Sequence, residues 1–400
     1  MFRPMKAIKF SLMIALLLAA ALSAAPAVHG QTTNPTECLT AFDPDVDYFP
    51  HKVAPSFASS FEVEYHKHYK VVRVTRPWVG AESGFTYLLV QCGAPTPTDE
   101  QFKEAVVVEV PIRTLISMST TYLPHLIELG VTDALIGVDT LQYTYAEEIR
   151  ALGEAGKLVE IGSGAQVNVE LVAVANPDLI MVYGSGSPDY DAHPKLIEAG
   201  YKVALNAEFT EQVPLGQAEW IKYTALFFNA EERANAYFEG VASEYARLAA
   251  LAERVSEKPS VFVGSPYQDV WYMPSGATYT AIFLRDAGAN YLWAEEQGAG
   301  SLPLSFEEVF AKAGDADFWL NVGFFSTLKD VEAADVRFTE FAAFKNGKVF
   351  NNNARVSPNF GFDFYESGVI RPHVILADLI AIFHPDLLPD HQLVYYQQMQ

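Results

Sequence analysis

The pattern of apolar and polar positions divides the chain into an irregular start, a β-rich segment and a longer α/β part. Residues 31–58 are polar and rich in proline, which is typical of an irregular lead-in. Two runs with alternating apolar residues follow at 61–80 and 85–92, and the turn sequence AESG stands between them. Alternation with a period of two predicts strands, so these runs predict a β-hairpin ahead of the linker GAPTPTDEQ.

Beyond the linker, short β-type runs alternate with short helical runs. Strand character is found in AVVVEV, TLISMS, ALIGV, LIMVYG and KVALN, and helical character in YLPHLIELG and HPKLIEAG. This spacing predicts parallel βαβ units. The same alternation starts again at SVFVGSP and continues to the C-terminus, so the pattern predicts two α/β lobes.

One long helix is expected between the two lobes. Residues 229–256 contain no proline, and Gly240 is their one glycine. Asn229 is a suitable N-cap, and Glu231 and Glu232 fall in the first turn, where the helix dipole favours acidic side chains. At about 1.5 Å per residue this helix would be about 40 Å long, which is enough to span a lobe.

The first 30 residues have the parts of an export signal. Arg3, Lys6 and Lys9 are basic, an apolar run follows, and Val28 and Gly30 occupy the −3 and −1 positions of a cleavage site. A membrane anchor is the alternative, but the apolar run is short for the ~20 residues of a spanning helix. We therefore expect a signal peptide, cleavage near Gly30 and a periplasmic protein.

The net charge excludes some classes of partner, and the number of cysteines indicates the compartment. The chain has 27 Lys and Arg against 49 Asp and Glu, a formal net charge of −22, which repels nucleic acid and anionic lipid. Cys38 and Cys92 are the two cysteines, and in an oxidising compartment an isolated pair is most simply a disulfide. The alternative, lipid attachment at Cys38, is disfavoured because NPTEC lacks the apolar and small residues of such a site.

The order of several stretches resembles one class of transport receptor. The matching stretches are VPIRTLISMSTTYLPHLIELG, NVELVAVANPDLIMV, PLGQAEWIKYTALFFN, WYMPSGATYTAIFLRDAGANYLWAEE, LPLSFEEVFAKAGDADFWLN and YESGVIRPHVILADLIAIFHPDLLP. In this order they resemble the periplasmic substrate-binding proteins of ABC importers for iron-siderophores, cobalamin and haem, over nearly all of the mature chain. The resemblance implies an α/β fold with two Rossmann-like lobes, parallel sheets, one joining α-helix and a ligand cleft between the lobes.

The resemblance also implies a receptor with no catalytic step and no cofactor. It would bind a metal chelate and deliver it to an ABC transporter permease in the inner membrane, and we expect a monomer. The expected parts are the signal peptide 1–30, the lead-in and hairpin 31–104, the first lobe 105–228, the helix 229–256 and the second lobe 257–400.

Four possible metal ligands lie near the C-terminus: His384, Asp386, Asp390 and His391. The segment VILADLIAIF before them is apolar on most sides, as a docked helix would be. His384 would suit the C-terminal end of the helix dipole, and Pro385 would stop the helix. We therefore predict a helix end here and not a metal site.

Ligands of parallel α/β sheets bind beyond the carboxyl ends of the strands, where the loops meet. For aromatic residues in these loops, such as Tyr183 and Phe324, packing in the core is the alternative. Trp271 and Tyr272 follow a strand in a loop with proline and glycine, which favours a ligand contact. The predicted ligand-binding residues are Ser119, Thr120, Thr121, Tyr122, Ser163, Tyr183, Ser185, Tyr267, Trp271, Tyr272, Phe324, Asn352 and Arg355.

The small number of cationic side chains near these loops indicates which ligand charge to expect. Ferric catecholates would need several convergent cations, but Arg355 is the one loop cation expected there, and Arg285 and Arg371 are expected to be structural. A neutral or weakly charged chelate, such as a hydroxamate siderophore or a corrinoid, suits the sequence better. Phe360 and Phe362 replace the small or amide residues typical of this loop in the family, so the ligand cannot be transferred from relatives.

Receptors of this class dock on their permease through a carboxylate on each lobe. The resemblance assigns Glu307, with Glu308 beside it, to the second lobe, and Asp189 or Asp191 to the first. On so acidic a chain, simple solvation is the alternative for each of these side chains.

Two rival classes of protein would need other residues. A secreted metalloenzyme or hydrolase would need a nucleophile with its base, or three convergent metal ligands, and the sequence has no G-x-S-x-G, H-E-x-x-H or C-x-x-C. A zinc or manganese receptor of the same fold would bring His, Asp and Glu to the cleft loops. His66 and His68 share one face of a predicted strand but have no third ligand nearby, so we favour a solvated strand face and a chelate receptor.

Overall fold

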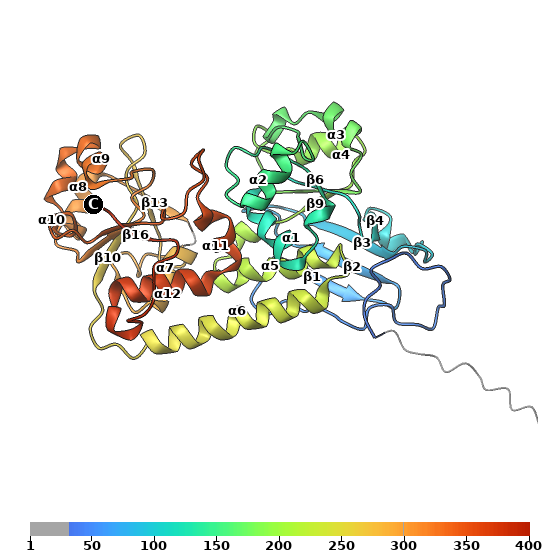
Figure 1. Ribbon diagram of the computed structural model, residues 1–400, viewed down its shortest axis with the longest axis horizontal. Helices are drawn as coiled ribbons and strands as arrows, with labels where there is room; N and C mark the ends of the chain where they lie inside the picture. The colour runs from blue at the N-terminus through green and yellow to red at the C-terminus, as the bar shows by residue number, and fades with distance from the viewer. Residues whose placement is uncertain (1–31, 299) are drawn as a thin grey trace, which may run out of the picture. The chain divides into compact units, whose positions relative to one another are not determined.

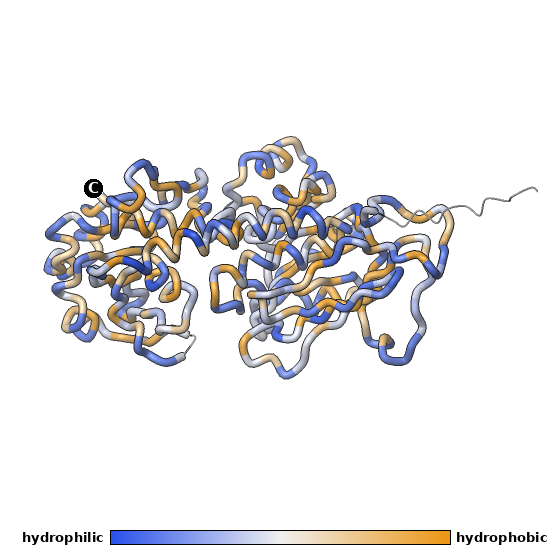
Figure 2. Tube along the Cα trace, turned by 90° about the horizontal axis from the view of Figure 1, so that it is seen from below, coloured by the Kyte–Doolittle hydropathy of each residue, from blue (hydrophilic) through white to orange (hydrophobic). Residues whose placement is uncertain are grey.

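A computed structural model describes residues 32–298 and 300–400, which belong to one compact unit (Figure 1). The expected signal peptide lies outside the described residues. No helix in the described part of the chain is long and apolar enough to cross a membrane. Figure 2 shows hydrophobic residues concentrated in the strands and packed helices, with hydrophilic residues in many of the outer loops.

A four-stranded sheet precedes the first lobe. Its order is β1-β2-β3-β4, antiparallel except for the β3–β4 pair. The strands are β1 (Phe61–Tyr65), β2 (Tyr69–Val74), β3 (Phe85–Gln91) and β4 (Val106–Val110). The first alternating run therefore forms two strands and not one, and β2 pairs with β3 as in the predicted hairpin.

His66 and His68 lie in the turn between β1 and β2, so the prediction that they share a strand face is wrong. The backbone N–H of His66 donates to the carbonyl of Tyr69 at 2.8 Å, which closes the turn. The ring of His66 stacks on the ring of Tyr69, with centroids 4.2 Å apart. This turn has no glycine, proline or asparagine, so it lacks the residues from which a turn is usually predicted.

The first lobe is built on a parallel sheet of order β7-β6-β5-β8-β9. Its strands are β5 (Leu115–Ser117), β6 (Leu135–Val138), β7 (Val159–Glu160), β8 (Leu179–Val182) and β9 (Val203–Leu205). Its helices are α1 (Leu123–Leu129), α2 (Glu147–Glu154), α3 (Val169–Ala175), α4 (His193–Glu198) and α5 (Pro214–Leu226). The central strands β5 and β8 are buried on both faces, which explains their continuous apolar runs.

The second lobe has the sheet order β12-β10-β14-β15-β16, which is parallel except for the edge strand β16. The strands are β10 (Ser260–Val263), β12 (Asn290–Tyr291), β14 (Phe318–Leu320), β15 (Val349–Asn351) and β16 (Gln397–Gln398), and β11 (Trp271–Pro274) pairs separately with β13 (Ser301–Leu304). The helices are α7 (Tyr279–Asp286), α8 (Phe306–Ala313), α9 (Leu328–Ala334), α10 (Ala342–Lys345), α11 (Ser367–Ile370) and α12 (Pro372–Phe383).

The long helix between the lobes is α6 (Glu231–Ala252), which packs against α5 and α12 (Figure 1). Its 22 residues make it about 33 Å long, somewhat shorter than predicted. Its N-cap is Ala230, so the prediction of Asn229 as N-cap is wrong. The Asn229 side chain instead donates to Pro35 O and Gln91 Oε1, because it serves the lead-in and the N-terminal sheet.

The C-terminal helix ends where the sequence predicts. Helix α12 stops at Phe383, His384 is its C-cap, and Pro385 starts a short 3-10 turn. The His384 ring lies 3.1 Å from Gly288 O. His391 Nε2 lies 2.7 Å from a carboxylate oxygen of Asp378, so these two histidines bind other parts of the protein.

Cys38 and Cys92 form a disulfide, as predicted, with Cα atoms 4.7 Å apart. The bond ties the lead-in to the end of β3, and Leu39 N donates to Cys92 O at 2.9 Å beside it. The lead-in is therefore an ordered part of this fold and not a loose tether.

Three buried glutamates connect the lead-in and the N-terminal sheet to the helices. Glu219 of α5 accepts hydrogen bonds from three successive backbone N–H groups at 56–58, and Glu211 accepts from those of Ser59 and Ser60. Glu231, the first residue of α6, accepts from Lys70 Nζ at 2.6 Å, and both side chains are fully buried. Burial lowers the pKa of Lys70, and the charge of Glu231 opposes this shift.

We predict that Lys70→Ala destabilises the protein by about 3–5 kcal/mol, because it leaves the Glu231 carboxylate buried without its cation. Lys67→Ala is the matched control, because Lys67 pairs at 3.3 Å with Asp45 on the surface, and its loss should change stability by less than about 1 kcal/mol. Urea denaturation of both variants measures the difference. Equal effects would show that the buried pair does not support the fold.

Candidate functional site

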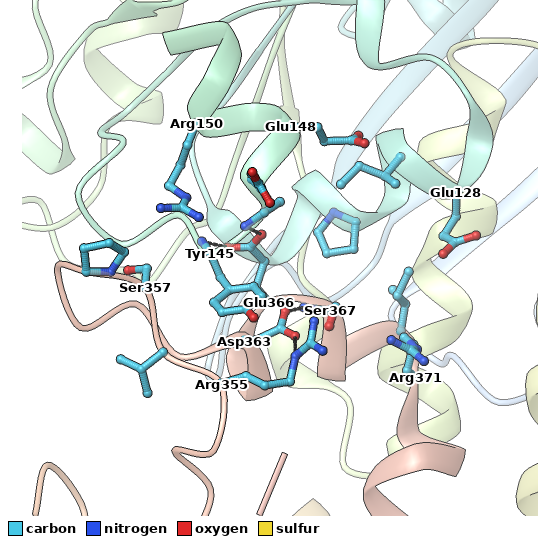
Figure 3. Close-up of a pocket in the computed structure, with 17 residues that line it drawn as sticks. Glu128, Tyr145, Glu148, Arg150, Arg355, Ser357, Asp363, Glu366, Ser367 and Arg371 are labelled. Atoms are coloured by element: carbon cyan, nitrogen blue, oxygen red, sulfur yellow. Dashed lines mark hydrogen bonds and ion pairs between the residues drawn. The ribbon is translucent and has the colours of Figure 1, made fainter. Parts of the chain in front are cut away.

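A pocket of about 510 Å³, called the larger pocket here, lies between the lobes (Figure 3). The first lobe supplies residues of α1 and of the start of α2, and the second lobe supplies 355–358 and the segment around α11. The start of α2 follows β6 and residues 355–358 follow β15, so both lie beyond carboxyl ends of parallel strands. This is the edge of the sheets where the sequence predicts a ligand.

Three arginines line this pocket, together with Glu128, Glu147, Glu148, Asp363 and Glu366. The Arg355 Nε donates to Asp363 Oδ2 at 2.6 Å, and its guanidinium lies 5.0 Å from the centre of the Tyr145 ring. Burial acts to lower the pKa of Arg355, but Asp363 together with Tyr145 and Tyr395 acts to raise it, and the net shift is upward. The predicted cation Arg355 is therefore at the site but is already paired.

Arg150 and Arg371 also line the pocket, although Arg150 is not among the predicted residues and Arg371 is predicted to be structural. The Nε of Arg150 is buried and has no hydrogen-bond partner among residues 32–298 and 300–400. Arg150 stands four residues after Ala146 on α2, so both lie on one helix face. Arg150 could have been predicted from the sequence, because a residue four positions into a helix that follows a cleft loop faces the same side as that loop.

Glu366 joins the two lobes beside this pocket. Its carboxylate belongs to the second lobe and accepts hydrogen bonds from Tyr145 N at 2.6 Å and Ala146 N at 2.8 Å in the first lobe. These N–H groups stand at the start of α2, where a helix lacks internal partners and favours an anion. Burial raises the pKa of Glu366 to about 7.

The lobes also approach closely at Gly361. A Cβ atom at this glycine would lie 1.9 Å from Tyr143 O, so no other residue fits here without a shift of the backbone. The loop 357–362 of the second lobe therefore contacts the loop after β6 of the first.

Another pocket between the lobes, called the smaller pocket here, has a volume of about 190 Å³, one acidic residue, Glu208, and walls that are mostly aromatic and aliphatic. Glu208 is 4% exposed, its Oε1 accepts from Thr121 Oγ1 at 2.7 Å, and its Oε2 has no hydrogen-bond partner in the described part of the chain. Burial raises the pKa of Glu208 to about 7. The predicted residue Thr121 is thus at an interlobe pocket.

The rest of the first predicted loop supports Thr121. Ser119 Oγ accepts from Thr121 N at 3.3 Å and caps the 3-10 turn that contains Thr120. The Tyr122 ring is buried, and its hydroxyl donates to Asn206 O at 3.0 Å. The predicted contact of Tyr122 with a ligand is therefore replaced by a contact inside the lobe.

Exposed aromatic side chains follow parallel strands in both lobes. Phe324, after β14, is 79% exposed, and its ring lies 5.7 Å from that of Phe362. Tyr272 is also exposed, on β11. Those that follow parallel strands are Tyr143, Tyr190 and Phe209 in the first lobe, and Tyr267, Phe324, Phe360 and Tyr365 in the second. Tyr267, Tyr272 and Phe324 are predicted ligand contacts, whereas the three exposed aromatic residues of the first lobe are not among the predicted residues.

Trp271 has no exposed surface, so for this residue the core-packing alternative applies and the predicted ligand contact does not. Its indole N–H donates to Val263 O at 2.8 Å, and its ring packs against Phe262 and Trp319. Asn352 is also buried, and its amide donates to the Tyr365 hydroxyl at 3.2 Å. Burial depends on distant segments, which a local pattern does not reveal.

The remaining predicted residues lie in the loops after β7 and β8. Ser163 is exposed, and Tyr183 is half-buried with its hydroxyl 3.3 Å from Tyr190 O. Ser185 donates to Asp191 Oδ1 from both its backbone N–H, at 2.6 Å, and its hydroxyl, at 2.8 Å. These contacts organise the loop itself.

The predicted docking carboxylates differ in exposure. Asp189 and Glu307 are exposed, and Glu307 lies 3.2 Å from Arg337 Nη1. Asp191 is buried and its oxygens are used within its own loop, so the prediction that it meets a permease is wrong. Glu308 forms a capping box with Ser305 at the start of α8 and is likewise engaged.

The described residues contain no group of three or more His, Cys, Asp or Glu arranged to hold a metal ion. The larger and the smaller pocket offer arginine, carboxylate, hydroxyl and aromatic groups instead.

Comparison with known proteins identifies the fold and the family. Residues 115–355, more than half of the chain, match the family described as "Periplasmic binding protein". An uncharacterized lipoprotein of Methanocaldococcus jannaschii is 27% identical over 323 residues, 76% of this chain and 73% of that protein.

Two solved structures have a similar fold. One is a possible iron-binding (periplasmic solute-binding) protein of Staphylococcus epidermidis, with TM-score 0.54, 17% identity, and coverage of 68% of this chain and 99% of that chain. The other belongs to an ABC-type Fe3+-hydroxamate transport system of Saccharomonospora viridis, with TM-score 0.51, 18% identity, and coverage of 68% and 94%.

We predict that Glu366→Ala speeds hydrogen exchange at the amides of Tyr145 and Ala146 by about tenfold or more, because they lose their acceptor. Glu160→Ala is the control, since Glu160 accepts from Leu141 N at 2.8 Å within the first lobe alone. Exchange measured by mass spectrometry or NMR should change near Leu141 in the control and at 145–146 in the first variant. Unchanged exchange at 145–146 in Glu366→Ala would mean that the interlobe contact is not formed in solution.

We predict that Glu208→Gln becomes more stable relative to the wild type as pH rises. The pKa of Glu208 is about 7 in the folded protein against a usual 4.5, so between these values the folded state binds more protons and loses stability with rising pH. The glutamine side chain has no such proton, so urea denaturation at about pH 5 and about pH 8 should show a relative gain of roughly 2 kcal/mol. Glu198→Gln, an exposed change of equal charge, is the control and should show no such gain.

Proposed function

Because the chain belongs to the periplasmic binding protein family, we propose that it is an extracytoplasmic receptor for a metal chelate. It binds the chelate between its two lobes and delivers it to an ABC transporter permease in the inner membrane. In this proposal the chain is exported, loses its signal peptide near Gly30 and acts as a monomer without a catalytic step.

The exposed aromatic side chains beyond the parallel strands carry this proposal. Both lobes supply them, for example Tyr143 and Phe209 in the first and Phe324 and Phe360 in the second. Large rings in water are unfavourable unless they meet a partner, and a ring offers wide contact area with little loss of side-chain freedom. An organic chelate has apolar surface to place against these rings, whereas a bare ion has none.

The charges of the larger pocket favour a neutral or weakly charged chelate. Its three arginines stand among five acidic side chains, and Arg355 already pairs with Asp363. An anionic ferric catecholate would need free convergent cations, and the net charge of −22 would repel it. A hydroxamate siderophore or a corrinoid fits this balance better. The fold similarity to the Fe3+-hydroxamate transport protein of S. viridis supports testing a hydroxamate first.

For contact with the permease we propose Glu307 in the second lobe and Asp189 in the first. Both side chains are exposed. The ion pair of Glu307 with Arg337 is also exposed, and exposed pairs are weak, so an arginine of the permease can replace Arg337.

The experiment is a calorimetric titration of residues 31–400 with ferric trihydroxamate, ferric catecholate, cobalamin, haem, Zn²⁺ and Mn²⁺. We expect one uncharged or weakly charged chelate to saturate the protein at a single site. Phe324→Ala should weaken this binding by about tenfold, since an aromatic contact contributes about 1–2 kcal/mol. Val174→Ala, which removes an exposed apolar side chain from α3, should leave the affinity unchanged.

Binding of Zn²⁺ or Mn²⁺ with no response to any chelate would replace this proposal with a metal-ion receptor of the same fold. If wild type and Phe324→Ala bind the chelate equally well, the proposed receptor function stands, but the aromatic residues of this loop do not contact the ligand.

A further inference from the structure

The smaller interlobe pocket contains a buried carboxylate that has no positive partner. Glu208 is 4% exposed, and its Oε2 has no hydrogen-bond partner within the described residues. The residues described as lining the pocket include no Lys, Arg or His. A buried charge without a partner is strongly unfavourable, so such a group calls for an explanation.

The other buried glutamates of this region are fully engaged, which makes Glu208 an exception. Glu231 holds Lys70, and Glu219 holds Lys222 together with a row of backbone N–H groups. Glu211 accepts from two backbone N–H groups and the Trp220 indole. These three carboxylates are fully hydrogen-bonded within the fold, whereas one oxygen of Glu208 is buried without a hydrogen-bond partner in a residue that lines a pocket.

The walls of the pocket are aromatic and come from both lobes. The first lobe contributes Phe209 beside Glu208, and the second lobe contributes Tyr279, Phe283, Phe364 and Tyr365. Ring faces attract organic cations, and a carboxylate next to such rings completes a site for an ammonium group. The pocket of about 190 Å³ is smaller than the ~300–1,000 Å³ typical of sites for whole small-molecule ligands, so it suits a single group.

We propose that this pocket, with Glu208 Oε2 as the acceptor and Tyr279, Phe283 and Tyr365 among its walls, binds an alkylammonium group. A bare metal ion fits less well, because hard cations take six or more oxygen ligands and soft ones take several His or Cys. The net charge of −22 attracts a cation to the protein.

The ammonium group has two possible sources. It can belong to a free amine, or it can be the end of an arm on the chelate that the larger site binds. The second source rests on the proposed receptor function, and the first does not. Because both lobes line the pocket, an ammonium group in it contacts both and favours the arrangement in which the lobes are together.

The experiment uses matched cationic and neutral probes on residues 31–400 at about pH 8, where the Glu208 carboxylate is mostly ionised. One pair is n-butylammonium and n-butanol. The other is a linear ferric trihydroxamate that ends in a primary amine and the same chelate with that amine acetylated. Calorimetry compares wild type, Glu208→Gln and the control Glu198→Gln, an exposed residue with the same change of charge.

We expect the cationic member of at least one pair to bind about tenfold or more tightly than its neutral partner, with the preference lost in Glu208→Gln and kept in Glu198→Gln. A preference for the amine-ended chelate alone assigns the group to the chelate. A preference for n-butylammonium without binding of either chelate supports this inference and counts against a hydroxamate ligand.

Equal binding of both chelates, with no response to n-butylammonium, would overturn the inference and leave the receptor function intact. A preference that survives in Glu208→Gln would also overturn it, because the cation would then bind elsewhere. If Glu208→Gln does not fold, the wild-type comparison of each cationic probe with its neutral partner still decides whether the protein selects an alkylammonium group.

Discussion

The buried pair of Lys70 with Glu231 determines where the long helix begins, and the arrangement of the lobes depends on that helix. Glu231 is the first residue of α6, and Lys70 Nζ also donates to Leu226 O and Asn229 Oδ1 at the end of α5. One ammonium group therefore joins the N-terminal sheet, the last turn of α5 and the first turn of α6. Because α6 then packs against helices of both lobes, the sheet ahead of the first lobe is part of the framework of the cleft.

Buried carboxylates also connect other segments that are distant in sequence. In each case the carboxylate accepts hydrogen bonds from backbone N–H groups of the other segment. Glu219 holds the lead-in, Glu366 holds the start of α2, and Asp378 holds the backbone of Val394, Tyr395 and Tyr396. Hydrogen bonds to an ionised acceptor are about twice as strong as neutral ones and fix the geometry of irregular segments. Glu366 differs from the others because its hydrogen bonds join two lobes. Its pKa is raised to about 7, so near neutral pH part of the protein carries the uncharged acid, which is a weaker acceptor for these N–H groups.

Most strands and helices of the two lobes could be predicted from the sequence, because short apolar runs, cap residues and loop lengths are local signals. The α1 helix ends at Gly130 and α3 at Asn176, both left-handed, as their residue types suggest. The missed features depend on distant partners. Asn229 is not a cap because its side chain is used by Lys70, Gln91 and Pro35. Trp271 is buried because Phe262 and Trp319 surround it, and neither contact is visible in its own loop.

The ligand is constrained by where the positive charges are and by what they already bind. Arg355 is paired with Asp363, and Arg150 and Arg371 share the larger pocket with further carboxylates. An anionic ligand would have to displace Asp363 to gain Arg355, and repulsion by the other carboxylates and the desolvation of its own charge would oppose binding as well. Glu208 in the smaller pocket has no cation to displace. Acidic side chains outnumber arginines between the lobes, so for the proposed receptor a neutral chelate or a positively charged group would add no further repulsion there.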